Sequence, residues 1–360
     1  MTANRWMLAS AFLVTGVIVG CSPTQTGSPS QTSTQTTTQT TNEPATLAHR
    51  DPIARSQMRE RALDQLTSAI SSESAQERAN ALEGLLYAPT RLEPIAALGL
   101  ADENEGVRSV AAMVVGRAGI RDLAPAVKTL QYDSSPFVVA SSLYALNALG
   151  EKVDPSPLGA MLFDADSTRV RSQAAFTLGE MGNDAALPML ADAARRPTPG
   201  SGVIEQKLLE LQIAEAMIKL GDRHQLDSVR AALLPASPDD LEATALAVQI
   251  IGEVQDRKSV DRLIYLSAYK NARGSQMPAE VMLAVAGSLG ELGERGGSFI
   301  ADRYASNPNE VLRAQAAHVY GQIGRAENLG KLEKLAQDQS GLVQVAASSA
   351  ILRILGSNGR

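Results

Sequence analysis

The chain has 360 residues, of which 44% are hydrophobic, and its 55 Ala and 42 Leu contrast with only 4% aromatic residues. This composition favours closely packed helices over a β-sandwich or an aromatic-rich α/β core. The formal net charge of −6 disfavours nucleic acid as the main partner, and one Cys and three His leave little for a disulfide or a histidine-rich metal site.

Residues 1–20 are predicted to be a secretory signal peptide. One early positive charge, Arg5, precedes an apolar stretch from Trp6 to Val19, which is too short for a comfortable transmembrane helix. The stretch ends in Ile18-Val19-Gly20-Cys21, which resembles the lipobox of bacterial lipoproteins. The resemblance implies cleavage before Cys21 and lipidation of this residue. The alternative is an ordinary signal peptide or an uncleaved anchor, followed by a chance Cys.

Residues 21–46 are predicted to be a lipidated Cys followed by a disordered tether. From Pro23 to Thr46 the chain has ten Thr and four Gln, and Glu43 is the only charged residue, so little apolar surface can offset the entropy of ordering. The lipid would hold the protein at the bacterial cell envelope. Ser22 rather than Asp follows Cys21, which by the enteric sorting pattern favours the outer membrane if the organism is Gram-negative.

One pattern is repeated through the remainder of the chain. Its three closest copies contain Arg108, Arg171 and Arg313, each followed by Ala-Ala three residues later, by Gly eight residues later and by Gly eleven residues later. Degenerate copies end at Pro89, Gly150, Gly221, Gln255, Gly293 and Gly356. The nine copies are 30 to 39 residues apart, which predicts about nine structural repeats within residues 73–360.

Each repeat is predicted to contain two helices. Val107, Val110, Ala111 and Val114 recur with helical spacing, and the closing Gly119 supplies the positive φ that a helix end prefers. The second half of the repeat has the same spacing. Two such short helices bury their apolar faces only if neighbouring repeats stack.

The motif Asp…Val-Arg-x-x-Ala-Ala-x-x-Leu-Gly-x-x-Gly resembles the short bacterial HEAT-like repeats of phycobilin-lyase-related proteins, over about residues 73–356. The resemblance implies an all-α fold, an α-solenoid in which helical hairpins stack into a right-handed superhelix. Residues 47–72 are expected to form an N-terminal capping helix before it.

The charged residues of the motif have two interpretations. Arg108, Arg171 and Arg313 could form an anion-binding ladder, but we expect them to pair with Asp side chains and loop carbonyls between repeats. The pairs Gly179-Glu180, Gly252-Glu253 and Gly290-Glu291 could supply carboxylates for acid–base chemistry. Because they recur with the repeat, we expect solvated helix faces instead.

Catalysis is not expected from the sequence. Deoxyhypusine hydroxylase resembles the predicted architecture and binds iron through His-Glu dyads, whereas His49, His224 and His318 precede Arg, Gln and Val here. No nucleophile motif or zinc spacing occurs either. We therefore expect no enzyme activity, no metal and no cofactor, and a phycobilin-lyase-like or other HEAT-repeat enzyme is the least favoured reading.

The leading hypothesis is a membrane-anchored protein-interaction scaffold of the cell envelope, and the alternative is a binder of an acidic polymer such as peptidoglycan or polysaccharide. Lys258, Arg262, Tyr265 and Tyr269 share one side of a predicted helix, and the resemblance to HEAT arrays implies that second helices line the concave face. Second helices of other repeats carry further basic residues, namely Arg121, Lys128, His224, Lys331 and Lys334. These residues predict a mildly basic groove for an acidic or extended peptide, unless the tyrosines simply pack against a neighbouring helix.

Overall fold

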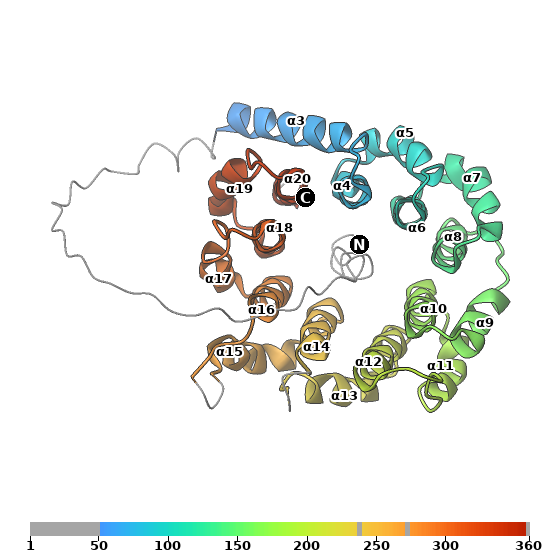
Figure 1. Cartoon of the computed structure of the whole chain (residues 1–360). Coiled ribbons are helices and arrows are strands. Elements are labelled where there is room, and N and C mark those ends of the chain that lie inside the picture. Colours follow the sequence, from blue (N-terminus) through green and yellow to red (C-terminus); the bar gives the residue numbers. More distant parts are fainter. Residues whose placement is uncertain (1–50, 236–239, 271–273, 358–360) are drawn as a thin grey trace, which may run out of the picture.

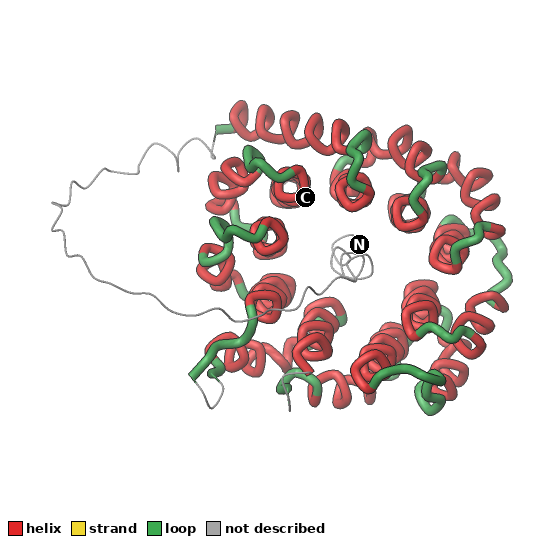
Figure 2. Tube along the Cα trace, viewed as in Figure 1, coloured by secondary structure: helices red, strands yellow, loops and turns green. Residues whose placement is uncertain are grey.

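The computed structural model describes residues 51–235, 240–270 and 274–357. Within these ranges the regular secondary structure is helical, and the one β-type contact is an isolated antiparallel bridge between Lys270 and Gln276. The prediction of an all-α, HEAT-like solenoid is confirmed (Figure 2). The predicted signal peptide, Cys21 and the tether lie outside the described residues.

The helices form two concentric layers around a closed ring (Figure 1). The inner layer contains α4 (Ala75–Gly84), α6 (Glu105–Ala118), α8 (Pro136–Ala148), α10 (Thr168–Met181), α12 (Val203–Lys219), α14 (Leu241–Glu253), α16 (Ala279–Glu291), α18 (Glu310–Ile323) and α20 (Gly341–Ser357). The outer layer contains α3 (Pro52–Ala69), α5 (Pro89–Leu100), α7 (Ala124–Thr129), α9 (Ser156–Asp164), α11 (Leu187–Ala193), α13 (Leu226–Ala231), α15 (Val260–Ala268), α17 (Ser298–Asp302) and α19 (Leu329–Leu335).

Short 3-10 helices join the layers. They are η1 (Leu85–Tyr87), η2 (Arg121–Leu123), η3 (Leu130–Tyr132), η4 (Asp184–Ala186), η5 (Arg223–Gln225), η7 (Arg257–Ser259), η8 (Arg295–Gly297) and η9 (Ala326–Asn328). Each motif copy therefore becomes an inner helix followed by an outer helix, which places the motif Arg and Gly residues in the inner layer.

The ring closes because the first helix completes the last repeat. The inner helix α20 is followed by no described outer helix, and α3 packs against it in that place, while α20 also packs against α4. The Gln65 amide of α3 donates to the Ala336 carbonyl at 2.7 Å, and Ser348 of α20 donates to Gln65 Oε1 at 2.7 Å. The segment that was expected to cap the array thus joins its two ends.

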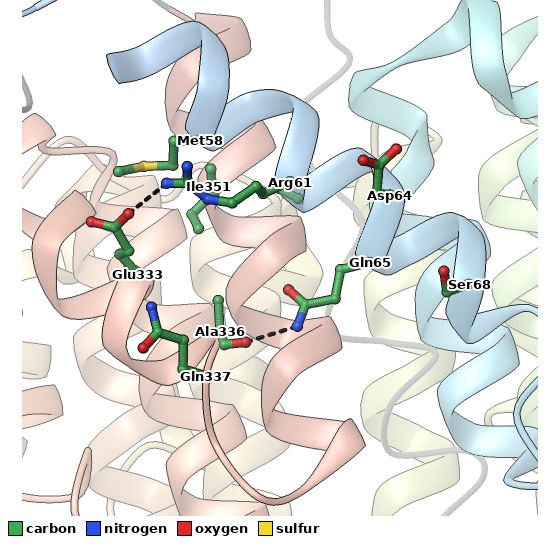
Figure 3. Close-up of a pocket in the computed structure, with 10 residues that line it drawn as sticks. Met58, Arg61, Asp64, Gln65, Ser68, Glu333, Ala336, Gln337 and Ile351 are labelled. Carbon is green, nitrogen blue, oxygen red and sulfur yellow. Dashed lines mark hydrogen bonds and ion pairs between the residues drawn. The ribbon is translucent and has the colours of Figure 1, made fainter.

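A cavity of about 420 Å³ lies at this junction (Figure 3). Met58 and Ile351 line it, and Arg61 of α3 forms an ion pair with Glu333 at 2.6 Å beside them. Because Arg61 and Glu333 neutralise one another between the first and the last repeat, we interpret the cavity as part of the junction that closes the ring.

Glycine at two motif positions explains how the inner helices end and how they pack. Gly119, Gly182 and Gly324 have φ values of 68°, 71° and 69° and end α6, α10 and α18, as the repeat predicts. The earlier glycine of each motif lies inside the helix, where it faces the next inner helix. A Cβ atom on Gly179 would lie 2.7 Å from Ala216 Cα, so only Gly permits this approach of α10 to α12.

The motif arginines tie successive repeats together, as expected. Arg108 donates through Nε and one terminal nitrogen to the carboxylate of Asp133, at 2.8 and 2.9 Å, and its other terminal nitrogen donates to two loop carbonyls. Arg313 and Asp338 repeat this arrangement at 2.8 and 2.7 Å. Arg171 departs from it and donates to the carbonyl of Ala165. These arginines are structural, and the anion-ladder reading is not supported.

Candidate functional site

Helix geometry shows which inner-layer side chains face the centre of the ring. We number the positions of each repeat from the motif Arg. Position eight, the motif Gly, faces the next inner helix, and position six faces the previous inner helix, as Gly179 of α10 and Ala216 of α12 show. At 100° per residue these two directions are nearly opposite. Positions three and seven are buried and mostly apolar, and they face the outer helix, as Ala174 and Leu178 do in α10. Positions two, five and nine are left to face the centre.

We call the residues at positions two, five and nine the inner face. In order of repeat they are Asn80, Glu83, Tyr87, Val110, Met113, Arg117, Ser141, Tyr144, Ala148, Gln173, Phe176, Glu180, Gln212, Glu215, Lys219, Leu246, Gln249, Glu253, Ala284, Gly287, Glu291, Gln315, His318, Gln322, Ala346, Ser349 and Arg353. Five Glu and three basic residues leave a formal surplus of two negative charges.

The most concentrated charge on the inner face surrounds Lys219 of α12. Its ammonium group lies 2.7 Å from Glu180 of α10, 2.5 Å from Glu215 on its own helix and 2.5 Å from Glu253 of α14. The side chains of Glu180 and Lys219 are only 1% and 9% exposed, and the Phe176 ring lies 5.1 Å from the ammonium nitrogen. One ammonium group therefore contacts three carboxylates from three successive inner helices, and the charge of Arg117 also acts on Glu180.

The pKa values of this cluster follow from its burial and its charge surplus. Burial raises the pKa of Glu180 above its ordinary value, against the opposing effect of Lys219. Burial, and next the charge of Glu215, raise the pKa of Glu253 well above its ordinary value. Burial opposes the charge on Lys219, but the three carboxylates outweigh it and raise the pKa of the lysine.

A second polar group lies on α16, α18 and α20. The Gln322 amide of α18 donates to Glu291 of α16 at 3.1 Å, and Arg353 of α20 lies 3.9 Å from the same carboxylate oxygen. Burial, and then the charge of Arg353, lower the pKa of His318 to about 3, so this imidazole is neutral at physiological pH. The Gln322–Glu291 hydrogen bond joins neighbouring repeats, and the Arg353–Glu291 contact joins α20 to α16 across the repeat between them.

The structure corrects the expectation that the Gly-Glu pairs are solvated faces. Glu180, Glu253 and Glu291 occupy position nine, and their side chains are 1%, 9% and 9% exposed. The adjacent Gly brings the neighbouring helix close, which is why the following side chain is enclosed. The recurrence of these pairs in the sequence therefore marks buried positions of the inner face, not solvated ones.

The predicted basic groove is also corrected, because second helices lie in the outer layer (Figure 1). Lys258, Arg262 and Tyr265 are exposed on η7 and α15, and Tyr269 at the end of α15 is half-buried with its ring 6.1 Å from that of Tyr265. The remaining predicted residues lie on other outer elements, namely Arg121, Lys128, His224, Lys331 and Lys334. They are spread around the outside of the ring and form no common groove.

Several of these basic residues have partners of their own. Lys128 lies 3.0 Å from Glu151, and Lys331 lies 2.5 Å from Asp302 and 5.1 Å from the Tyr320 ring. The apolar side of α15 also differs from the prediction, because Leu263 and Leu266 are buried while Ile264 is 49% exposed.

Two further properties of the described residues bear on function. No group of three or more His, Cys, Asp or Glu among them is arranged to hold a metal ion, and in the Lys219 cluster the ammonium occupies the place between the carboxylates. None of the helices in the described ranges has the length and apolar content to cross a membrane.

Comparison with known proteins gives structural likeness alone. No protein-family model and no curated protein matches the sequence. The phycocyanin lyase complex of CpcE and CpcF from Nostoc is similar at 14% identity and a TM-score of 0.36, over 70% of this chain and 91% of that one. Human deoxyhypusine hydroxylase is similar at 16% identity and a TM-score of 0.35, over 78% of this chain and 96% of that one. The YibA protein of Escherichia coli is similar at 14% identity and a TM-score of 0.33, over 74% of this chain and 96% of that one.

These likenesses correct the expectation that the chain is not an enzyme. Two of the structures named above are a lyase and a hydroxylase, so the architecture does not separate a scaffold from a catalyst. At these identities the likeness assigns neither activity nor ligand to this chain. The absence of catalysis is therefore no part of the function proposed below.

Proposed function

We propose that the protein is a lipid-anchored scaffold of the bacterial cell envelope that binds a protein partner through the inner face of its helical ring. The observation that carries this proposal is the chemistry of the inner face. Its charged and amide side chains recur at the positions that face the centre of the ring, and the inner helices present them around one centre. A repeat protein conventionally uses such an extended concave surface for binding.

The membrane part of the proposal rests on the residues around Cys21. The lipobox-like sequence and the Thr-rich segment after it are typical of a lipid anchor followed by a tether. A lipid on Cys21 would hold the ring near the membrane surface.

An acidic polymer is the less favoured ligand. The inner face carries five Glu against three basic residues, so it would repel peptidoglycan carboxylates or an acidic polysaccharide at short range. The basic residues that were predicted to form a groove for an acidic or extended peptide lie apart on the outside of the ring.

Site-specific photo-cross-linking in cells tests the partner and the surface together. A photoreactive amino acid replaces Leu246, on the inner face of α14, or Leu98, which is 62% exposed on the outer helix α5. We expect position 246 to give adducts with one partner protein reproducibly, and position 98 to give none. Adducts from position 98 alone would refute the inner-face assignment, and adducts from neither position would refute the scaffold proposal.

The anchor is tested separately by Cys21→Ala. We expect this variant to lose fatty-acid labelling and to accumulate as precursor or as released protein, with unchanged helicity. Sedimentation of wild-type protein with purified cell wall, in the absence of other proteins, would instead support the polymer alternative.

A further inference from the structure

We propose that the ring opens between its first and last described helices and that this opening admits the partner to the inner face. This inference rests on the proposed function and adds to it how the inner face is reached. We call the packing of α3 and α4 against α20 and the end of α19 the joint. The enclosure of the inner face, the course of the chain and the contacts at the joint support the opening.

Polar side chains of the inner face are enclosed while the ring is closed. Glu215 of α12, Gln249 of α14 and Arg353 of α20 are 2%, 7% and 8% exposed. Contact with a partner requires heavy atoms to approach within about 4.5 Å, which side chains this little exposed do not allow. Binding at the inner face therefore needs a second arrangement of the helices, and a partner that binds only this arrangement shifts the protein toward it.

The course of the chain makes the joint the place where the ring parts most readily. Successive repeats elsewhere are linked by the chain as well as by packing, whereas α4 and α20 are linked by packing alone. When these two helices part, each keeps its other neighbour, α6 or α18. Because the stability of a repeat array is approximately the sum of repeat and neighbour contributions, the remaining repeats stay folded when this one interface is lost.

The joint lacks the ion pair that ties repeats together elsewhere. Between the repeats of α6 and α8, Arg108 and Asp133 form a pair whose side chains are 17% and 10% exposed. Gln344 occupies the Arg position of α20, and its side-chain oxygen accepts a hydrogen bond from Gln65 of α3 at 3.2 Å. A contact between neutral amides thus replaces charge-assisted hydrogen bonds, which are roughly twice as strong as neutral ones.

The ion pair that crosses the joint is open to solvent. The side chains of Arg61 and Glu333 are 59% and 36% exposed, and pairs of this kind contribute little to stability. The cavity of about 420 Å³ lies beside this pair, with α3 on one side and α19 and α20 on the other (Figure 3). These contacts leave the closure of the ring mainly to the apolar side of α3, with Leu63 and Leu66 buried.

Thiol labelling tests the opening without a partner. Ser348→Cys at the joint is compared with Ser141→Cys on α8, in the full-length chain in detergent with Cys21→Ala, which removes the one native thiol. Both serines are fully buried, and each has a hydrogen bond of 2.7 Å to a side chain of a neighbouring helix, Gln65 or Ser109. We expect a maleimide to label Ser348→Cys at least about tenfold faster, because local opening exposes it. Equal rates, or faster labelling of Ser141→Cys, would overturn the proposal.

A disulfide across the joint tests the route to the inner face. A Cβ on Gly84 of α4 would overlap the Ser349 hydroxyl of α20, so Gly84→Cys with Ser349→Cys brings two thiols together across the joint. Ser109→Cys with Ser141→Cys is the matched control between α6 and α8, where the two hydroxyl oxygens are 2.7 Å apart. We expect the joint disulfide to reduce adducts from the photoreactive position 246 at least about fivefold, and the control disulfide to leave them unchanged. Reduction should restore the adducts, and non-reducing electrophoresis verifies both disulfides.

The outcomes separate the opening from the proposed function. Adducts that persist with the joint disulfide in place leave the scaffold and overturn the opening. Equal loss of adducts with both disulfides also contradicts a specific role of the joint. Absence of adducts from position 246 in the chain without these cysteines removes the scaffold, and the thiol-labelling rates then decide the opening alone.

Discussion

The inner and outer layers of the ring are built from the same chain repeats but pack differently. Gly179 of the inner helix α10 has no room for a Cβ, whereas Gly159 of the outer helix α9 would meet only the Met189 sulfur, at an ordinary 3.6 Å. Small residues therefore let the inner helices approach more closely than the outer helices. This difference in spacing bends the array, and over nine repeats it brings the last helix back to the first.

The two layers also differ in what their polar residues do. Inner-layer polar side chains contact one another between repeats, as around Lys219, while outer-layer side chains such as Arg262 and Tyr265 are exposed singly. The buried ion pairs around Lys219 and Glu291 therefore lie in the inner layer, whereas outer-layer ion pairs such as Lys128–Glu151 and Lys331–Asp302 are exposed. The predictions below test this difference at buried residues of the inner layer and the joint and at exposed residues.

The largest effect is expected at the joint between the chain ends. Leu66 of α3 is fully buried, so Leu66→Ala should lower the free energy of unfolding by about 3 kcal/mol. The same truncation at Ile53, which is 68% exposed on the same helix, should change it by less than about 0.5 kcal/mol. Urea unfolding followed by circular dichroism measures both. Similar values for the two variants would mean that α3 does not close the ring.

A smaller difference in unfolding free energy, with opposite signs, is expected for Ala substitutions at two glycines. Gly179→Ala forces α10 and α12 apart and should cost about 1–3 kcal/mol of unfolding free energy. Gly159→Ala meets no clash and raises helix propensity, so it should be neutral or stabilise by up to about 1 kcal/mol. Thermal melting of both variants gives the comparison, and a stabilised Gly179→Ala protein would show that the inner spacing is not set by Gly.

Loss of an arginine that joins two repeats should cost about 2 kcal/mol, because Arg108→Ala leaves Asp133 and two loop carbonyls without their donor. Arg262→Ala, on the exposed side of α15, should cost less than about 0.5 kcal/mol. Denaturant titrations at neutral pH measure the difference, and equal costs would contradict the assignment of Arg108 to the repeat junction.

The same ion pair predicts a dependence on acid. The hydrogen bonds from Arg108 hold the pKa of Asp133 below its ordinary value. A carboxyl group whose pKa is lowered by folding stabilises the protein above its unfolded pKa of about 3.9, and this stabilisation is lost as the pH falls through the lowered pKa. The stability difference between wild type and Arg108→Ala should therefore shrink in acid below about pH 4. A stability difference between wild type and Arg108→Ala that grows in acid would contradict the lowered pKa of Asp133.

The Lys219 cluster should show the opposite dependence on pH. Burial and the charge of Glu215 raise the pKa of Glu253, so its ionisation becomes unfavourable for folding as the pH rises above the unfolded value of about 4.3. Glu253→Gln should therefore gain stability relative to wild type between acid and neutral pH. Glu242→Gln, an exposed change on the same helix, should follow wild type throughout. Parallel curves for wild type and Glu253→Gln would contradict the buried charge surplus.

The smallest effect is expected on the outside of the ring. Tyr265 is 58% exposed, so Tyr265→Ala should alter unfolding free energy by less than about 0.5 kcal/mol and leave capture of the partner unchanged. Co-purification from cells measures the capture. Loss of partner capture in this variant would indicate that the partner binds the outer layer, not the inner face.

The sequence alone was sufficient for the local features of the repeat. Helix spacing, the positive φ at Gly119 and the Arg108–Asp133 pair all follow from residues that are near one another in the chain or one repeat apart. Such features depend on local backbone preference and on hydrogen bonds whose partners recur at fixed spacing, so they are legible without a structure.

Which helix of each hairpin faces the centre was decided by tertiary packing. Periodicity identifies the apolar side of a helix, but it does not give the sign of the curvature, and with the wrong sign Lys258, Arg262, Tyr265 and Tyr269 were assigned to a groove. Closure of the ring could not be predicted from the sequence either, because it is the sum of small rotations between successive repeats. The sequence determined the repeat and its internal contacts. The tertiary structure decided that the repeats form a ring with Glu180, Lys219 and Glu253 inside, because curvature accumulates from the close packing of helices far apart in the chain.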